Sequence, residues 1–228
     1  MEQLTGKTSD ELAAELQGVI FRLPGPVPEG ERPTYVTADE YLSGNVRRKL
    51  RQAQRAAQQD PAFAINVEAL TAAQPKDLDA SEIEVRLGAT WIDKKYIQQF
   101  MYETFNTPNY LQRAIQVNYT SYTAEWQITG KSSVSENNVA AYTTYGTSRA
   151  NAYKILEDSL NLRDVRIYDT VEDADGKERR VLNAKETTLA AQKQQAIRDA
   201  FRDWIWRDPE RRQTLVRQYN EEMNSTRP

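Results

Sequence analysis

Residues 115–128 read IQVNYTSYTAEWQI, and the hydrophobic pattern changes its period in this stretch. Ile115 and Val117 alternate with polar residues, and Trp126 and Ile128 alternate again after a short run of turn-like residues. Two alternating runs separated by a turn are typical of a β-hairpin. On both sides of the hairpin, apolar residues recur mainly at helical spacing, which makes this stretch decisive for the fold class.

The part before the hairpin is predicted to be mainly helical. Val46, Leu50, Ala53 and Ala57 fall on one face of a helix over residues 45–58. A helix is predicted from the Thr8/Glu11 capping box to Gln17, and others are predicted to begin at the Thr37/Glu40 capping box, after Asp60-Pro61 and after Asp93. A short strand is predicted at Val19–Phe21 and a loop at 23–33. This region therefore contributes helices and one short strand.

The part after the hairpin returns to helices. The predicted elements are a third strand at 140–144, a helix from Thr147 or Ser148 through Leu160, a second hairpin (165–171 and 177–182, turning at Asp175-Gly176), a helix capped by Asn183, and a last helix from Asp208-Pro209. Helices, then strands, then helices favour an α+β fold. We expect helical N- and C-terminal parts around a small antiparallel sheet of hairpins.

Four segments describe the expected organisation of one compact unit. They are an N-terminal helix, strand and Pro/Gly-rich loop (1–34), a helical part with a basic helix (35–112), an antiparallel hairpin part (113–183) and a C-terminal helical pair (184–228). We expect this unit to be a fragment of a larger protein.

Met1–Gly6 lacks a basic start followed by an apolar core, and no apolar run reaches membrane-spanning length, so a cytoplasmic protein without membrane contact is predicted.

The composition limits the chemistry that these side chains can perform. The 228 residues include no histidine and no cysteine, which removes the usual general base, the thiolate nucleophile and the common zinc ligands. The sequence therefore predicts no catalytic, cofactor-binding or metal-binding residue and no enzymatic activity for this fragment.

Short motifs that imitate active sites fail on their spacing. Gly6-Lys7-Thr8 would need a glycine at Met1 to be a phosphate-binding loop, and Gly130-Lys131-Ser132 fails in the same way. Asp60-Pro61-Ala62-Phe63 lacks the second proline of the amino-methyltransferase motif and is interpreted as a helix start. Asp173–Gly176 resembles part of a calcium loop, but a hairpin turn explains it.

The clearest candidate for binding is the basic helix. The net charge of the chain is −3, yet residues 44–59 carry Arg47, Arg48, Arg51 and Arg55 and no acid. Arginines at this spacing share a helix face and can meet successive DNA phosphates. The alternatives are a solvated face, or ion pairs with the acidic segments on either side.

A second candidate is an aromatic cluster within or beside the first hairpin. Its members are Tyr119, Tyr122, Trp126, Tyr142 and Tyr145. Aromatic side chains on a sheet can stack on nucleic-acid bases. They can equally fill a hydrophobic core, and strand alternation already accounts for two of them.

Four longer phrases carry a family resemblance. They are YVTADEYLSGNVR (35–47), VRLGATWI (85–92), YGTSRANAY (145–153) and WIWRDPERR (204–212). The chain resembles the middle region of very large methyltransferase–helicase proteins carried by plasmids, phages and integrative elements of bacteria. In that family an adenine-specific DNA methyltransferase domain precedes this region and a Swi/Snf-type helicase domain follows it. The motifs for cofactor, methyl transfer and ATP lie outside the matched region.

The resemblance implies a function for the fragment. We expect a non-catalytic connector that positions the flanking methyltransferase and helicase domains and touches the DNA backbone. The alternatives are a degenerate portion of an adenine-specific DNA methyltransferase, or a protein-interaction domain that meets its partner through exposed aromatics such as Trp204 and Trp206.

Overall fold

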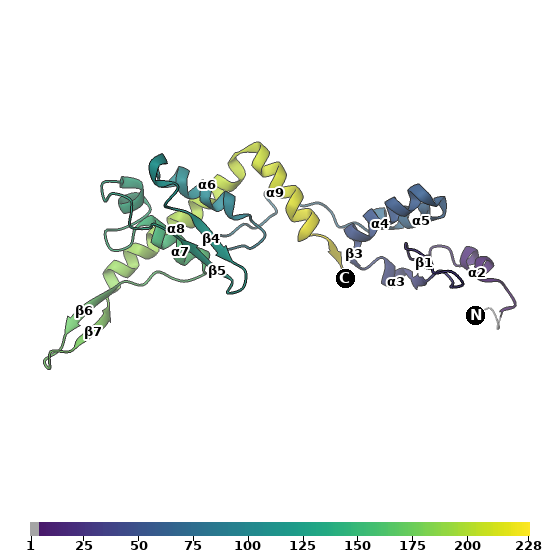
Figure 1. The fold of residues 1–228 in the computed structure, drawn as a ribbon, viewed down its shortest axis with the longest axis horizontal. Helices are drawn as coiled ribbons and strands as arrows, with labels where there is room; N and C mark the ends of the chain where they lie inside the picture. Colours follow the sequence, from purple (N-terminus) through teal and green to yellow (C-terminus); the bar gives the residue numbers. More distant parts are fainter. Residues whose placement is uncertain (1–4) are drawn as a thin grey trace. The chain divides into compact units, whose positions relative to one another are not determined.

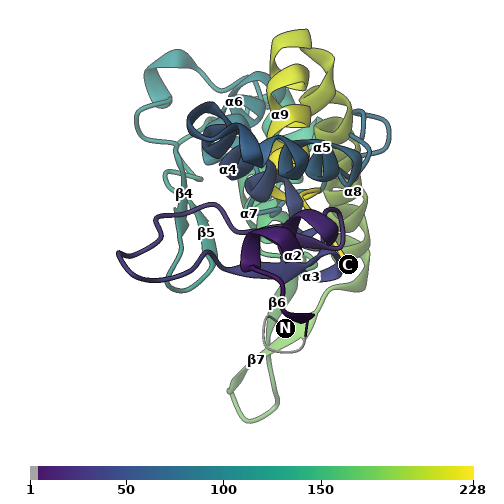
Figure 2. The ribbon, with the colours of Figure 1, turned by 90° about the vertical axis from the view of Figure 1, so that its right-hand side faces the viewer.

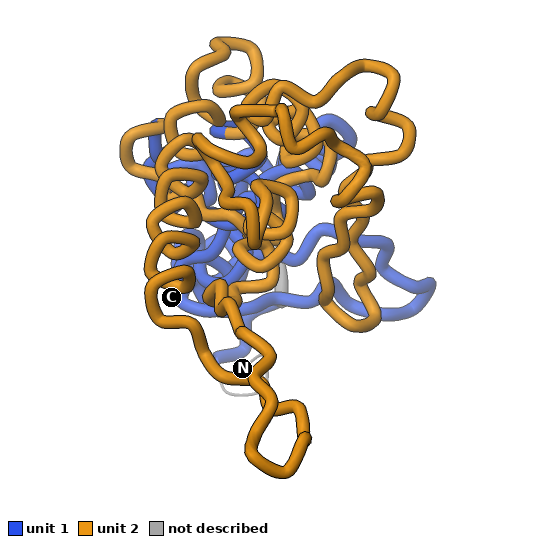
Figure 3. Tube along the Cα trace, turned by 90° about the vertical axis from the view of Figure 1, so that its left-hand side faces the viewer, with its two compact units in different colours: residues 1–79, 216–228 blue, residues 80–215 orange. Residues whose placement is uncertain are grey.

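The computed structural model describes residues 5–228, with only the backbone at residues 9 and 10, and divides the chain into two compact units. Unit 1 contains the chain up to Asp79 together with Val216–Pro228, and unit 2 contains Ala80–Leu215 (Figure 3). The boundaries of these two units do not coincide with the boundaries of the four predicted segments. The first four residues, on which the expectation of no secretory signal partly rests, lie outside the described part.

The described residues form helices and short antiparallel strands (Figure 1). The helices are α2 (Ser9–Glu15), α3 (Ala38–Tyr41), α4 (Val46–Gln59), α5 (Ala64–Ala72), α6 (Lys94–Thr104), α7 (Ala152–Leu160), α8 (Ala184–Arg207) and α9 (Pro209–Glu222). The strand pairs are β1 (Ile20–Arg22) with β2 (Tyr35–Thr37), β3 (Gly44–Asn45) with β8 (Thr226–Arg227), β4 (Val117–Thr120) with β5 (Glu125–Ile128), and β6 (Tyr168–Glu172) with β7 (Glu178–Leu182). The α+β prediction is confirmed, but the described strands form separate two-stranded sheets.

Most helices begin at the capping residues predicted from the sequence. The Thr8 side chain accepts a hydrogen bond from the Glu11 backbone N–H while the Glu11 carboxylate accepts one from Thr8 N–H, a complete capping box. Asp93 and Asn183 cap α6 and α8 with accepted bonds of 2.8 and 3.0 Å. Asp60 accepts from the backbone of Ala62 and starts a 3-10 turn, which confirms its interpretation as a helix start.

Unit 1 is built around the buried side chains of α4. Val46 and Ala53 are fully buried, and they pack in one cluster with Phe21, Tyr41 and Leu70. The rings of Phe21 and Tyr41 stack with centroids 5.0 Å apart. Figure 2 shows α4 and α5 beside each other, and these two helices make extensive mutual contact. The apolar stripe predicted for residues 45–58 is therefore the side that faces the core.

Unit 2 has an aromatic core between α6 and α8. Phe100 of α6 is fully buried, and its ring meets those of Phe105, Phe201 and Trp204 edge to face at 5.1–6.1 Å. Tyr153 of α7 reaches the same core and is also fully buried. Edge-to-face ring pairs add stabilisation beyond the area they bury.

The first hairpin is held by side chains of the neighbouring helices. Asn161, which follows α7, accepts from Trp126 N–H and donates to Trp126 C=O, so it satisfies both backbone groups of one residue. The Glu157 carboxylate accepts from Ile128 N–H at 2.7 Å, and Gln98 of α6 accepts from the β4 residue Val117. An isolated two-stranded hairpin is marginal in water, so these bonds account for its stability here.

Two predictions between the hairpins were wrong. Residues 140–144 form a single π-helical turn, closed by the Tyr145 N–H to Ala140 C=O bond, and not a strand. Ala140 and Ala141 are both buried, whereas a strand would turn consecutive side chains to opposite faces. The next helix is capped by Asn151, because the Thr147 hydroxyl accepts the Arg149 and Ala150 N–H groups in a tight turn instead.

The second hairpin is shorter than predicted and projects from the rest of unit 2 in both Figure 1 and Figure 2. Val165 and Ile167 are buried before β6 begins, so they anchor the hairpin rather than extend it. The turn at Gly176 has a positive φ of 76°, as the predicted Asp-Gly turn requires. Almost all side chains of β6 and β7 are exposed on both faces.

Candidate functional site

The basic helix presents three arginines on the side opposite its buried stripe. With about 100° per residue, Arg48, Arg51 and Arg55 fall within about 60° of one another. The same geometry puts Val46 and Ala53 on the other side of α4, where both are buried. We call the exposed side formed by Arg48, Arg51 and Arg55 the arginine face.

The arginine face carries positive charge that nothing described neutralises. All three side chains are exposed, and none forms an ion pair or hydrogen bond with another described residue. Their helical neighbours at positions 52, 54, 58 and 59 are glutamines, so α4 contains no acid. The alternative that the flanking acidic segments pair with these three arginines is not seen in the described chain.

The two other basic residues of this helix hold unit 1 together. Arg47 donates from Nε to the backbone oxygen of Asn224 at 2.9 Å and pairs with Asp77, and its side chain is 15% exposed. Lys49 donates to the carbonyls of Glu40, Tyr41 and Ser43 at 2.9–3.0 Å, at the end of α3. A cation among the last carbonyls of a helix satisfies groups that lack helical partners. The structure thus separates Arg47 from the arginine face.

Alanine at position 47 is expected to destabilise unit 1 by about 1–3 kcal/mol, because partly buried carbonyls lose a charged donor. Alanine at position 51 on the same helix is the matched control, and we expect a change within about 0.5 kcal/mol. Urea denaturation monitored by circular dichroism measures both. Equal effects of the two substitutions would contradict the structural role given to Arg47.

The predicted aromatic cluster does not form one surface. Trp126 is buried and its ring lies 4.7 Å from that of Tyr119. Tyr142 donates to a backbone oxygen inside unit 2, and Tyr145 packs on a core phenylalanine. Tyr122, in the β4–β5 turn, is 96% exposed and stands apart from the others. Trp126 therefore belongs to the core, Tyr119, Tyr142 and Tyr145 are half-buried beside it or elsewhere in unit 2, and the five side chains do not form one base-stacking platform.

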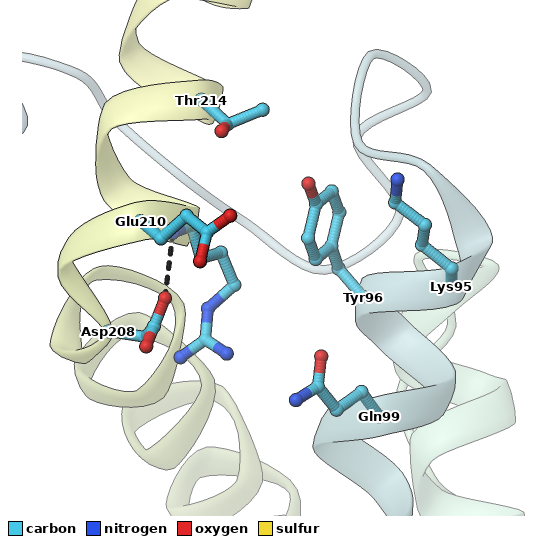
Figure 4. A pocket seen from close by; sticks show the side chains of 7 residues that line it. Lys95, Tyr96, Gln99, Asp208, Glu210 and Thr214 are labelled. Atoms are coloured by element: carbon cyan, nitrogen blue, oxygen red, sulfur yellow. Dashed lines mark hydrogen bonds between the residues drawn. The ribbon is translucent and has the colours of Figure 1, made fainter.

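A polar pocket of about 380 Å³ lies in unit 2 between α6 and the start of α9 (Figure 4). Tyr96 and Gln99 extend into it from α6, and Glu210 faces Tyr96 from the opposite side. Lys95 lies over the ring of Tyr96 at 4.9 Å. Cations and acids are mixed around this pocket, so its charge does not select one sign of ligand.

The buried cation of this pocket has a structural task. Arg211 is buried; its guanidinium lies 3.6 Å from the centre of the Trp204 ring and donates to the Ile205 carbonyl at 3.0 Å. Burial lowers the pKa of Arg211, and the nearby Asp208 opposes that shift. Arg211 therefore closes the C-terminal end of α8. Trp204 is buried beneath it, so the prediction of an exposed Trp204 was wrong.

Comparison with known proteins places this architecture in a family. A family model described as Domain of unknown function (DUF8437) matches residues 86–225, more than half of the chain. The chain belongs to the DUF8437 family. No curated protein and no solved structure matches the chain.

The DUF8437 match covers nearly all of unit 2 and the last helix, and it begins after the arginine face in the sequence. Within residues 5–228, no group of three or more acidic side chains is placed to hold a metal ion. No helix in the described part of the DUF8437 chain is long and apolar enough to cross a bilayer.

The imitated motifs have ordinary structural roles in this DUF8437 protein. Lys131, from Gly130-Lys131-Ser132, pairs with Glu157 at 2.6 Å.

Burial raises the pKa of Tyr41, Tyr102 and Tyr153, so these phenols stay protonated near neutral pH. They act as hydrogen-bond donors or partners within the core, as between Tyr153 and Thr107 at 2.6 Å.

Proposed function

We propose that this chain is a non-catalytic, cytoplasmic connector that contacts the DNA backbone through the arginine face and positions flanking domains. The observation that carries the proposal is the unpaired charge of Arg48, Arg51 and Arg55 on a helix without acids. Charges that meet phosphates release condensed counterions, which favours binding without reading sequence. The resemblance to methyltransferase–helicase proteins of bacterial mobile elements supports the same role, with the two catalytic domains as the flanking partners.

The rigid backing of the arginine face supports this role further. Val46 and Ala53 fix α4 against the core of unit 1, and Lys49 ties it to the end of α3. The three arginines are therefore held on one side of a well-packed helix, although their own side chains stay free. A helix held in this way presents its charges at a fixed spacing to successive phosphates.

The test is duplex DNA binding by the full chain, measured by fluorescence anisotropy across a salt series. We expect weak, sequence-tolerant binding whose log K falls with log salt. The variant R48E/R51E/R55E should bind far more weakly, and the salt slope of its residual binding should be shallower by about 2–3, because about 0.9 counterion is released per phosphate contact. Undetectable binding of the wild-type chain at low salt would refute the DNA contact.

A matched control separates the position of the charge from its amount. K177E/R179E/R180E, on the exposed β6–β7 hairpin, changes the net charge by the same amount as the α4 variant. We expect this control to retain most of the affinity and the salt slope. Equal losses in the two variants would show that overall charge, and not the arginine face, governs binding.

A protein-interaction role is the second candidate, and the β6–β7 hairpin favours it. Val171, Val181 and Leu182 are exposed large apolar side chains on this projecting hairpin. Light scattering of the chain alone and with the flanking domains tests this candidate. Removal of binding by V171S/V181S, with DNA affinity unchanged, would support it.

A further inference from the structure

A second cavity in unit 2 gathers three arginines around an apolar wall. It has a volume of about 280 Å³ and lies between segment 84–87, the end of α7 and the C-terminal half of α8. Arg198 and Arg202 line it from α8, one helical turn apart, and Arg86 lines it from segment 84–87. Two segments distant in sequence therefore bring three arginines to the lining of one cavity.

The arginines of this α7–α8 cavity are available to an incoming anion. Arg86 has no ion-pair partner among the described residues. Arg198 and Arg202 each face an exposed aspartate, Asp164 at 3.8 Å and Asp199 at 3.7 Å, with no hydrogen bond between them. Such exposed pairs contribute little stability, and a bidentate anion can displace them.

The wall of the cavity is apolar and includes a residue in an unusual conformation. Val85 and Leu87 are buried beneath it, and Leu162 is 69% exposed at its rim. Leu162 has φ of 56° and follows the end of α7, where the Arg163 N–H closes the helix onto Asp158 C=O at 2.8 Å. Glycine is the usual residue at this helix-terminating position, because leucine is strained there.

We propose that the α7–α8 cavity binds a nucleoside phosphate. Three guanidinium forks offer more donors than a carboxylate can accept, and a phosphate monoester presents three oxygens and close to two negative charges. The exposed Leu162 gives an apolar surface for the flat face of the nucleoside. Glu84, the one acid among the lining residues, can accept from a sugar hydroxyl or a base amino group. In this site the Leu162 side chain contacts the ligand, which gives the strained residue a role in binding.

This site is independent of the arginine face, because every residue in it belongs to unit 2. The phosphate can come from a free nucleotide or from the 5′ end of a nucleic-acid strand. Adenosine monophosphate (AMP) represents the first source, and a 5′-phosphorylated single-stranded oligonucleotide represents the second. Both are tested in the R48E/R51E/R55E background, so that backbone binding through α4 does not contribute.

Isothermal titration calorimetry of the full chain measures the binding. We expect AMP to bind at least tenfold more tightly than adenosine or inorganic phosphate, since each of these supplies half of the contacts. R86Q/R202Q should weaken AMP binding at least tenfold, whereas R179Q/R180Q on the exposed hairpin should leave the AMP affinity unchanged. Circular dichroism confirms that the variants remain folded.

Leu162→Gly separates binding from folding. Glycine relieves the strain at φ 56°, so the melting temperature should rise by about 2–4 °C while AMP binding weakens three- to tenfold. Inorganic phosphate, which does not reach the apolar wall, should bind L162G as it binds the parent chain. A role confined to the fold would instead leave AMP affinity unchanged.

The outcomes decide the proposal and its source. Tighter binding of AMP than of the oligonucleotide indicates a free nucleotide, and the reverse order indicates a strand end. In either case R86Q/R202Q must weaken the binding of the tighter ligand. No binding of either probe at millimolar concentration overturns the proposal. So does binding that R86Q/R202Q or L162G leaves unchanged, or preferential binding of an acidic peptide. None of these results depends on whether the arginine face binds duplex DNA.

Discussion

Replacing Phe100 with alanine is expected to lower the free energy of unfolding of unit 2 by about 3–5 kcal/mol. The Phe100 ring is fully buried and contacts the rings of Phe105, Phe201 and Trp204. Its removal leaves a cavity where α6 meets α8, and the neighbouring rings cannot collapse to fill it without losing their own packing. Chemical denaturation followed by tryptophan fluorescence measures the loss.

Tyr122→Ala provides the matched control for this prediction. Tyr122 lies in the same unit and is also aromatic, but it is 96% exposed. We expect its replacement to change the stability by no more than about 0.5 kcal/mol. A Phe100→Ala effect as small as that of the control would show that α6 does not pack on α8 as described.

Gly146→Ala is the second substitution with a large expected effect. A Cβ at this position would lie 2.0 Å from the Ala141 carbonyl oxygen and 2.6 Å from the Ala152 backbone nitrogen. Both are backbone atoms, one in the π-helical turn and one at the start of α7, so neither can move aside alone. We expect a loss of about 3 kcal/mol or more, since overpacking usually costs about 1–3 kcal/mol even where side chains can adjust.

Thermal unfolding of Gly146→Ala by calorimetry checks this expectation. Ser148→Ala, two residues further along the same turn, is the control, because Ser148 is exposed and its side chain has no partner in the described structure. Its melting temperature should match that of the wild-type chain. If Gly146→Ala also melted like the wild type, the close approach of the turn to α7 would be disproved.

The helices were predictable because their signals are local. The caps at Thr8, Asp93 and Asn183 depend on residues two or three positions apart, and each forms its expected hydrogen bond. The buried stripe of α4 follows in the same way from a 3.6-residue period. The hairpin turn at Gly176 needed only an Asp-Gly pair.

The short strands and the π-helical turn were not predictable from local signals. β3 pairs with β8, whose residues lie about 180 positions away in the chain, and neither strand has a pattern of its own. Residues 140–144 contain a tyrosine and two threonines, which favour strands, yet tertiary packing buries the neighbouring Ala140 and Ala141 together. Packing outweighs the weak preference of so short a segment.

The candidate sites were also predictable only where their residues lie close together in the sequence. The arginines of α4 stand out in the sequence because no acid accompanies them, but the separate role of Arg47 depends on Asp77 and Asn224. The α7–α8 cavity was missed. Arg198 and Arg202 share a helix face at a spacing of four, whereas Arg86 carries no sequence signal that links it to them.

The sequence by itself determined the α+β class, most helix starts, the Asp-Gly turn and the basic character of α4, because each rests on residues close together in the chain. Only the tertiary structure decided which arginines remain unpaired, that Trp204 is buried, and that Arg86 meets α8. These outcomes depend on contacts between distant segments, whose partners are selected by the packing of the whole core and not by local propensity.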